Sequence, residues 1–151
     1  SMQKGYDKAV SQFSRNLLAI VKKSLTLGIP PMGGGVTWQP LSPATIERWG
    51  QHPIYNLTGL YSRSVGLYRY KSRVLIGLPI GTRRSSQKKL TLNQLAMMLE
   101  FGSSDGRIPP RPVWAPSLKA AGGKNKLKQL ILTEIRKELQ KYGVRPNQVK
   151  W

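Results

Sequence analysis

Few residues in this chain could perform acid–base or metal chemistry, and they are scattered. The 151 residues include one histidine, His52, six Asp and Glu residues and no cysteine. The absence of cysteine excludes disulfides, thiolate nucleophiles and Cys-based zinc or iron–sulfur sites. A Ser–His–acid site that uses His52 stays open because triads form in space, although no nucleophile-elbow motif supports it. Its partners would be Ser42 or Ser62 together with Asp105.

The other motifs that could carry catalysis are weak. The glycine run at residues 33–35 lacks the Lys-Ser/Thr that ends a phosphate-binding P-loop, so it indicates a linker. No Asp-x-Asp or Glu-x-Lys pair marks a magnesium-dependent nuclease, which stays a third alternative. Glu134 and Glu138 lie one helical turn apart near two lysines, a pattern typical of solvated ion pairs. We therefore predict a non-enzymatic protein with no catalytic, cofactor-binding or metal-binding residue.

Net charge is the strongest signal in the composition. The chain has 25 Lys and Arg residues against 6 Asp and Glu, which gives a formal charge of +19 at pH 7. Self-repulsion of this size favours a polyanion or an acidic protein as a partner. No acidic residue lies between Glu47 and Glu100. Contact with DNA or an acidic partner is assigned to seven cations in this interval: Arg69, Lys71, Arg73, Arg83, Arg84, Lys88 and Lys89.

Contacts through these cations would be non-specific and steeply salt-dependent. Tyr61, Tyr68 and Tyr70 alternate with the basic residues and offer, as an alternative, a platform on which bases stack. Half of those rings must face the core if they lie on a two-sided strand. Phosphate contact is therefore favoured over base recognition.

Apolar spacing and capping signals predict an α+β fold. Apolar residues three and four apart predict amphipathic helices over about residues 6–27 and about 124–142, the second ending at Gly143. Three shorter helices are predicted at residues 43–49, 57–64 and 92–101, with Ser42, Thr58 and Thr91 as their respective N-caps. The last of these opens with a capping box, Thr91 and Gln94. The two long helices are expected to pack on a small antiparallel sheet.

That sheet is predicted as a hairpin. Residues 65–70 and 73–79 are rich in strand formers, and Lys71-Ser72 can form the turn between them. Val113-Trp114 is expected as an edge strand, and a further helix is expected to begin at Pro116. One domain over residues 1–143 and a tail over 144–151 account for the chain. No apolar run approaches the roughly 20 residues that span a bilayer, so no membrane contact is expected.

One stretch joins an apolar helix end to a proline-rich segment. Leu95-Ala-Met-Met-Leu-Glu-Phe-Gly-Ser-Ser104 runs into a loop, and Pro109-Pro-Arg-Pro-Val-Trp-Ala-Pro116 follows. Glycine and serine favour a turn here, and residues before proline favour extended backbone. This layout predicts a docking edge with a movable loop and no group that does chemistry.

Four short motifs together resemble a known family. They are Trp38-Gln-Pro-Leu-Ser-Pro-Ala-Thr-Ile46, Leu57-Thr-Gly-Leu-Tyr-Ser-Arg-Ser64, Leu99-Glu-Phe-Gly-Ser103 and Pro109-Pro-Arg-Pro112. In this order and spacing they look like the tail-completion proteins of tailed bacteriophages, of the Mu-like virion morphogenesis family and the related neck or head–tail joining family. The resemblance spans about residues 36–120.

The resemblance implies a virion structural protein without enzymatic activity or cofactor. Such a protein forms a homo-oligomeric ring, often a hexamer, at the neck or tail top, after assembly in the host cytoplasm. Its partners would be copies of itself, the phage connector, tail-tube or sheath proteins, and genome DNA that passes through the ring without sequence recognition.

Under this hypothesis aromatic and Arg residues are expected at contacts between subunits, where they are enriched. The residues assigned to such contacts are Phe101, Pro110, Arg111, Pro112 and Trp114. The alternative is a stand-alone basic DNA-binding accessory protein, which would tolerate changes at Phe101 or Trp114.

Overall fold

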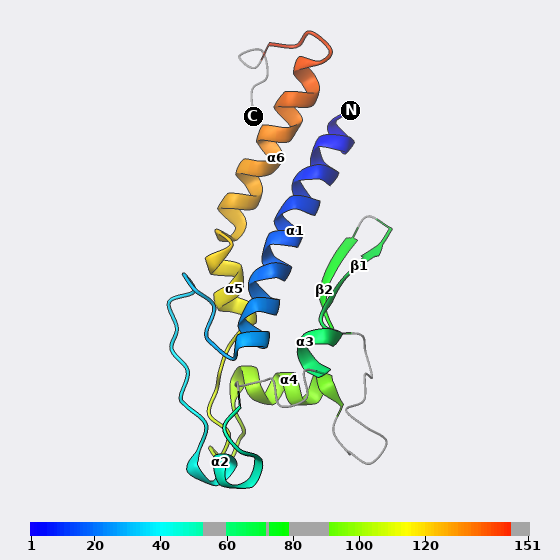
Figure 1. Ribbon diagram of the computed structural model, residues 1–151. Coiled ribbons are helices and arrows are strands. Elements are labelled where there is room, and N and C mark those ends of the chain that lie inside the picture. The colour runs from blue at the N-terminus through cyan, green and yellow to red at the C-terminus, as the bar shows by residue number, and fades with distance from the viewer. Residues whose placement is uncertain (53–59, 72, 79–90, 146–151) are drawn as a thin grey trace.

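The structure, a computed structural model, describes residues 1–52, 60–71, 73–78 and 91–145. Two long helices, α1 (Met2–Leu27) and α6 (Gly123–Gln140), lie side by side and antiparallel (Figure 1). A two-stranded hairpin, β1 (Gly66–Tyr70) and β2 (Arg73–Gly77), lies on another side of α1. Short helices and extended segments gather at the end opposite the N-terminus and the C-terminal end of α6 (Figure 1). This arrangement confirms the predicted α+β class.

Helix α1 begins four residues earlier than predicted and ends where expected. Ser1 caps its first turn by accepting a hydrogen bond from the backbone N–H of Lys4, and Gly28 ends it in the left-handed conformation, with φ of 65°. The helix also includes Gly5, which is buried. A Cβ atom at this position would lie 2.9 Å from backbone atoms of Glu134 and Ile135 in α6. Gly5 therefore permits the close approach of the two long helices.

The hairpin is confirmed, with an antiparallel register that pairs Tyr68 with Leu75 and Arg69 with Val74. Lys71 occupies the turn with a φ of 52°, while Ser72 lies outside the described residues. Successive residues of a strand face opposite sides. Tyr68 and Leu75 accordingly form the exposed outer face, whereas Val74 is half-buried on the side that carries Arg69.

The short helices follow their capping signals. Helix α2 (Pro43–Trp49) has Ser42 as its N-cap, as predicted. Helix α3 (Leu60–Ser64) matches the end of the predicted 57–64 helix, whose cap, Thr58, lies outside the described residues. Helix α4 (Leu92–Phe101) has the complete capping box predicted from its sequence.

The segment after α4 differs from the prediction. Val113 and Trp114 are not a strand: Val113 is the N-cap of α5 (Trp114–Ala120), which therefore begins two residues before Pro116. The strand prediction was wrong because it weighed the β-propensity of two residues and overlooked a remote side chain that caps this helix. Helix α6 ends at Gln140, slightly before the predicted end, and Gly143 takes a φ of 77°.

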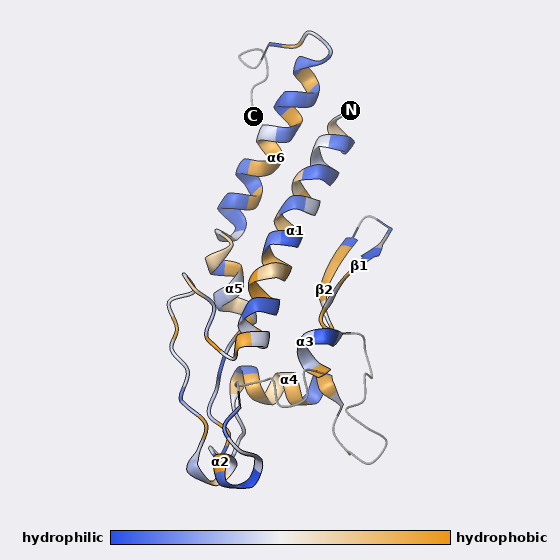
Figure 2. Cartoon of the chain, viewed as in Figure 1, coloured by the Kyte–Doolittle hydropathy of each residue, from blue (hydrophilic) through white to orange (hydrophobic). Residues whose placement is uncertain are grey.

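The main core lies where the C-terminal half of α1 meets α3, α4 and the start of α5. Its buried members come from these elements and the residues beside them: Val21, Leu25, Tyr61, Val65, Leu92 and Val113. Hydrophobic residues are concentrated in this region, whereas α6 and the N-terminal half of α1 are mixed (Figure 2). The one buried residue of α6 is Glu134. None of the described helices is both long enough and apolar enough to cross a membrane.

Candidate interaction site

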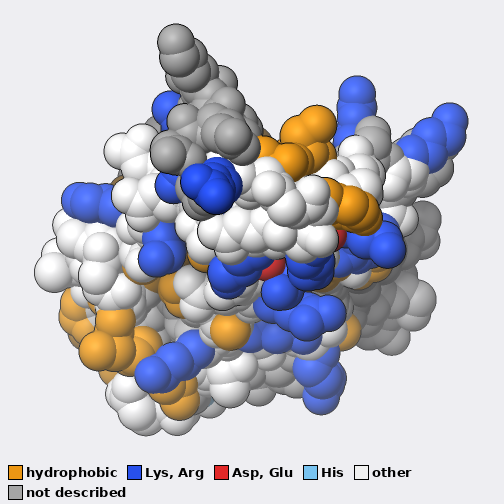
Figure 3. Space-filling view, turned by 90° about the horizontal axis from the view of Figure 1, so that it is seen from above, with side chains coloured by type: hydrophobic (Ala, Val, Ile, Leu, Met, Phe, Trp, Pro, Cys, Tyr) orange, Lys and Arg blue, Asp and Glu red, His pale blue; other side chains and the backbone are white. Residues whose placement is uncertain are grey.

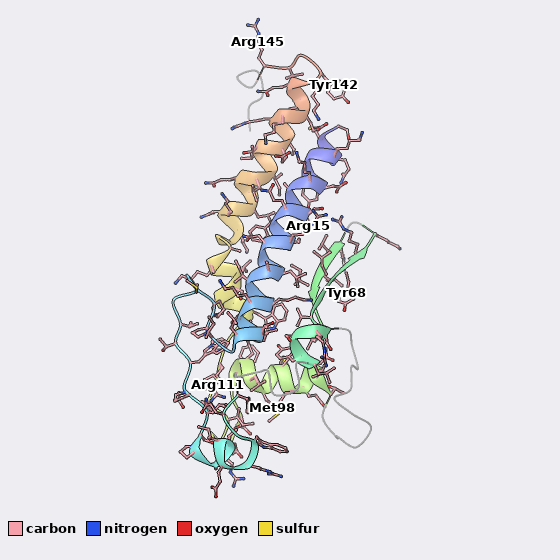
Figure 4. The ribbon with its side chains drawn as sticks, viewed as in Figure 1. Arg15, Tyr68, Met98, Arg111, Tyr142 and Arg145 are labelled. Atoms are coloured by element: carbon pink, nitrogen blue, oxygen red, sulfur yellow. The ribbon has the colours of Figure 1, made fainter. Side chains whose placement is uncertain are left out.

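Three of the four sequence motifs are joined by hydrogen bonds that Arg111 and Trp38 donate. The indole Nε1 of Trp38 donates to the backbone oxygen of Pro112 over 3.0 Å. In the other direction, the Arg111 guanidinium donates to the backbone oxygens of Gln39 and Pro40, each over 2.8 Å. The backbone N–H of Arg111 donates to the Leu99 oxygen over 2.7 Å. We call this region the motif junction; Figure 4 labels Arg111 within it, between α2 and α4.

Glu100 links α4 to α5 through its carboxylate. Its oxygens accept hydrogen bonds from the backbone N–H groups of Val113, over 2.7 Å, and Trp114, over 3.1 Å. The side chain of the N-cap residue, Val113, makes no capping hydrogen bond to α5. A carboxylate at a helix N-terminus satisfies otherwise unpaired donors and interacts favourably with the helix dipole. Glu100 therefore supplies from α4 the cap that α5 lacks locally.

Tyr61 brings the remaining motif, in α3, to the same place. Only 4% of this residue is exposed. Burial raises the pKa of Tyr61 to about 12, because the phenolate would lose its hydration; a hydrogen bond with the Trp114 side chain acts in the opposite sense, and the Glu100 charge raises it further. The ring is thus a neutral member of the core near Glu100 and Trp114. It does not contribute to a base-stacking surface.

The loop that follows α4 is restrained by its own polar groups. Ser103 and Ile108 exchange two hydrogen bonds, from the Ser103 N–H to the Ile108 oxygen and from the Ile108 N–H to the Ser103 hydroxyl. Asp105 accepts from the Ser103 hydroxyl and from the Arg107 N–H, and these donors lower the pKa of its carboxyl. The predicted movable loop is therefore a cross-braced turn that presents a defined surface.

A groove of about 730 Å³ runs between this turn and the segment that leads into α2. Its apolar lining includes Leu41, Leu99, Phe101, Ile108 and Pro109. Phe101, the last residue of α4, is 72% exposed at the groove. Apolar anchors of this kind, in a pre-formed depression, are the features on which protein interfaces depend most.

The five residues predicted to contact other subunits separate into two groups. Phe101 and Pro110 are exposed and line the groove. Arg111 is buried, and Pro112 and Trp114 are half-buried by contacts within the chain. Arg and Trp are enriched in interfaces because they combine apolar area with directional hydrogen-bond donors. The same properties allow them to hold irregular segments of one chain together.

The basic residues are described in part. Arg69, Lys71 and Arg73 are exposed on the hairpin, and the Arg69 guanidinium donates a hydrogen bond to the Ser11 hydroxyl of α1. The predictions for Arg83, Arg84, Lys88 and Lys89 lie outside the described residues. Viewed from the end at which the N-terminus and the C-terminal end of α6 lie, many Lys and Arg side chains are visible on the surface and few acidic ones (Figure 3).

Two acidic residues have structural roles that differ from the sequence predictions: Glu134 was expected in a solvated ion pair, and Glu100 had no assigned partner. Glu134 is buried and forms ion pairs with Lys8 of α1, over 2.9 Å, and Lys137, over 2.8 Å. The hydrogen bonds from Lys137 and Lys8 lower the pKa of its carboxyl. Glu100, which caps α5, is the other. The sequence did contain a signal for both roles. When a strongly basic chain has only a few acidic residues, each of them is expected to have a cation or a backbone N–H group as its partner.

Two of the residues named for a Ser–His–acid site have other roles in the described structure. Ser42 caps α2 and Asp105 braces the loop after α4. Within the described parts of the chain, no group of three His, Cys, Asp or Glu side chains is placed to hold a metal ion.

Searches against family models, curated proteins and solved structures gave no match for this chain. Its function is therefore inferred from its own residues.

Proposed function

We propose that this protein is a non-enzymatic virion component that forms a ring at the head–tail junction of a tailed phage, as a neck or tail-completion protein. The observation that carries the proposal is the motif junction. Residues from three of the four motifs meet there and line a groove with Phe101 exposed at its rim, while Tyr61 of the remaining motif packs in the core near Glu100. The motif series is thus accounted for by residues that build and hold a docking surface.

A ring explains the combination of this groove with the high charge. Each chain carries a formal charge of +19, so closing a ring of copies multiplies the repulsion. DNA that passes through the ring, or acidic neighbours in the particle, would offset it. Apolar contacts at the groove would supply the attraction between adjacent subunits.

A second candidate, a stand-alone DNA-binding accessory protein, is favoured by the charge alone. It gives no role to the groove and predicts that Phe101 can be changed without loss of function. The two candidates therefore differ in what they predict for a single exposed side chain.

The test compares Phe101→Ser with Met32→Ser. Met32 is a matched control because it is 73% exposed, as against 72% for Phe101, and does not line the groove. Each purified protein is added to tails of the virus whose genome encodes the chain, and rings at tail ends are counted by negative-stain electron microscopy. We expect the unchanged chain and Met32→Ser to bind and Phe101→Ser to fail. Absence of the unchanged chain from tails, or equal binding by Phe101→Ser, would overturn the proposal.

A further inference from the structure

One face of α1 carries a straight row of four cations, Lys4, Lys8, Arg15 and Lys22. Their separations of four and seven residues, at about 100° per residue, place all four within about 40° of one another around the helix. Lys4 and Lys22 are eighteen residues apart, which is five full turns and about 27 Å along the axis. We call these four residues the α1 row.

The hairpin extends the α1 row sideways. Arg69 of β1 is tied to α1 by its hydrogen bond to Ser11, and Lys71 lies at the hairpin turn; Arg73 is on the outer face of the hairpin, two positions from Leu75. Lys4, Lys8 and Arg15 are exposed, and Lys22 is half-buried. Arg15 lies on the part of α1 that is next to the hairpin (Figure 4). Two elements therefore present cations on adjoining surfaces.

The acidic residues near this surface neutralise little of its charge. Glu134 is shared between Lys8 and Lys137, and Glu138 is paired with Lys141. Asp7 accepts a hydrogen bond from Gln3 and is the acid of α1 itself. Lys4, Arg15 and Lys22 have no acidic partner among the described residues. The face consequently keeps a large positive excess.

We propose that the α1 row and the adjoining hairpin cations bind the phosphate backbone of duplex DNA. An acidic protein is the less suitable partner, because protein interfaces use apolar anchors and are depleted in Lys. The large exposed apolar residues of α1 are Met2, Tyr6 and Leu27; around the helix, Met2 and Tyr6 are about 160° from Lys4 and Leu27 is about 140° from it. A linear, Lys-rich surface without such anchors matches a rod that carries one negative charge per roughly 1.7 Å of its axis.

Binding of this kind positions DNA without reading its sequence, because phosphates carry no base information. The inference goes beyond the proposed function, since a single chain suffices and neither the groove nor a ring is needed. It also places the principal contacts on α1, which was predicted only as an amphipathic helix that packs on the sheet.

The test compares two double variants that lose the same charge. Lys4→Gln with Arg15→Gln removes two exposed members of the α1 row. Lys124→Gln with Lys128→Gln removes two exposed cations of α6; Lys128 lies about 180° around that helix from Lys137, the residue that shares Glu134 with Lys8. Fluorescence anisotropy of a labelled 20-base-pair duplex of arbitrary sequence gives Kd between 50 and 200 mM NaCl. Circular dichroism checks that both variants keep the helical content of the unchanged chain.

Each phosphate contact contributes about 0.9 to the slope of log Kd against log salt concentration. We expect the α1 variant to lose about two such contacts, so that over this fourfold salt range the unchanged chain weakens about tenfold more than the variant does. The α6 variant should keep the original slope. The proposal is overturned if both variants reduce the slope equally, if the α1 variant leaves it unchanged, or if a peptide of twenty glutamates binds the chain more tightly than the duplex does. None of these results bears on tail binding by Phe101→Ser, so the two proposals fail separately.

Discussion

Arg111 is the residue whose role changes most between sequence and structure. Its guanidinium holds the carbonyls of residues 39 and 40, which lie in a segment without a strand partner. We expect Arg111→Lys to lower the free energy of unfolding by about 1–3 kcal/mol, because an ammonium cannot reproduce the fork of donors. Urea unfolding followed by circular dichroism measures this. Arg107→Lys is the control, since the Arg107 side chain is 88% exposed; an equal effect of both substitutions would contradict the assigned role.

The structural roles of single residues were predictable where their hydrogen-bond partners are near in sequence. Ser42, Thr91 and Gln94 act within one helical turn, and their capping roles follow from local backbone geometry. Glu100 and Arg111 bond to groups that lie 13 and 71–72 residues away. No local pattern specifies such partners, so Arg111 was assigned to contacts with other subunits and Glu100 was given no role.

At the scale of elements, the contact between α1 and α6 depends on the glycine at position 5, which has no side chain. A Cβ at Gly5 would lie 2.9 Å from the α6 backbone, which cannot move as a flexible side chain could. We expect Gly5→Ala to lower the free energy of unfolding by about 1–3 kcal/mol, because this overlap outweighs the helix propensity that alanine adds. Chemical denaturation gives the value. Gln12→Ala, at an exposed position of α1, should change stability by less than about 0.5 kcal/mol. A neutral or stabilising Gly5→Ala would show that the helices are not held this closely.

Elements with a regular spacing of apolar residues or a complete helix-capping motif were predictable from sequence. Elements that depend on contacts with remote residues were not. The long helices, the hairpin and α4 all have local signals that agree with their environment. Helix α5 has a valine at its N-cap and takes its capping carboxylate from α4. The groove was expected only as a docking edge, because its shape requires the segment before α2 to meet the turn after α4.

For the whole molecule, the groove and the cationic face are built from different elements. Helices α2 and α4 border the groove, whereas α1 and the hairpin carry the cations (Figure 1). The proposed binding to other protein, through Phe101, and the proposed binding to DNA, through the α1 row, can therefore vary independently. A subunit that must join its neighbours around a nucleic acid needs this separation.

The charge of the whole molecule leads to an expected response to salt. Screening weakens the ion pairs of Glu134, but it also relieves repulsion among cations that outnumber acids by 25 to 6. Because repulsion involves many more pairs, we expect the Tm of the isolated chain to rise between 20 and 500 mM NaCl. If screening reduces the repulsion in the folded state by about 1 kcal/mol, the Tm of a chain of this size rises by about 4 °C. Differential scanning fluorimetry measures the shift, and the Lys4→Gln, Arg15→Gln variant should show a smaller one. A Tm that falls with added salt would mean that the internal ion pairs outweigh the repulsion.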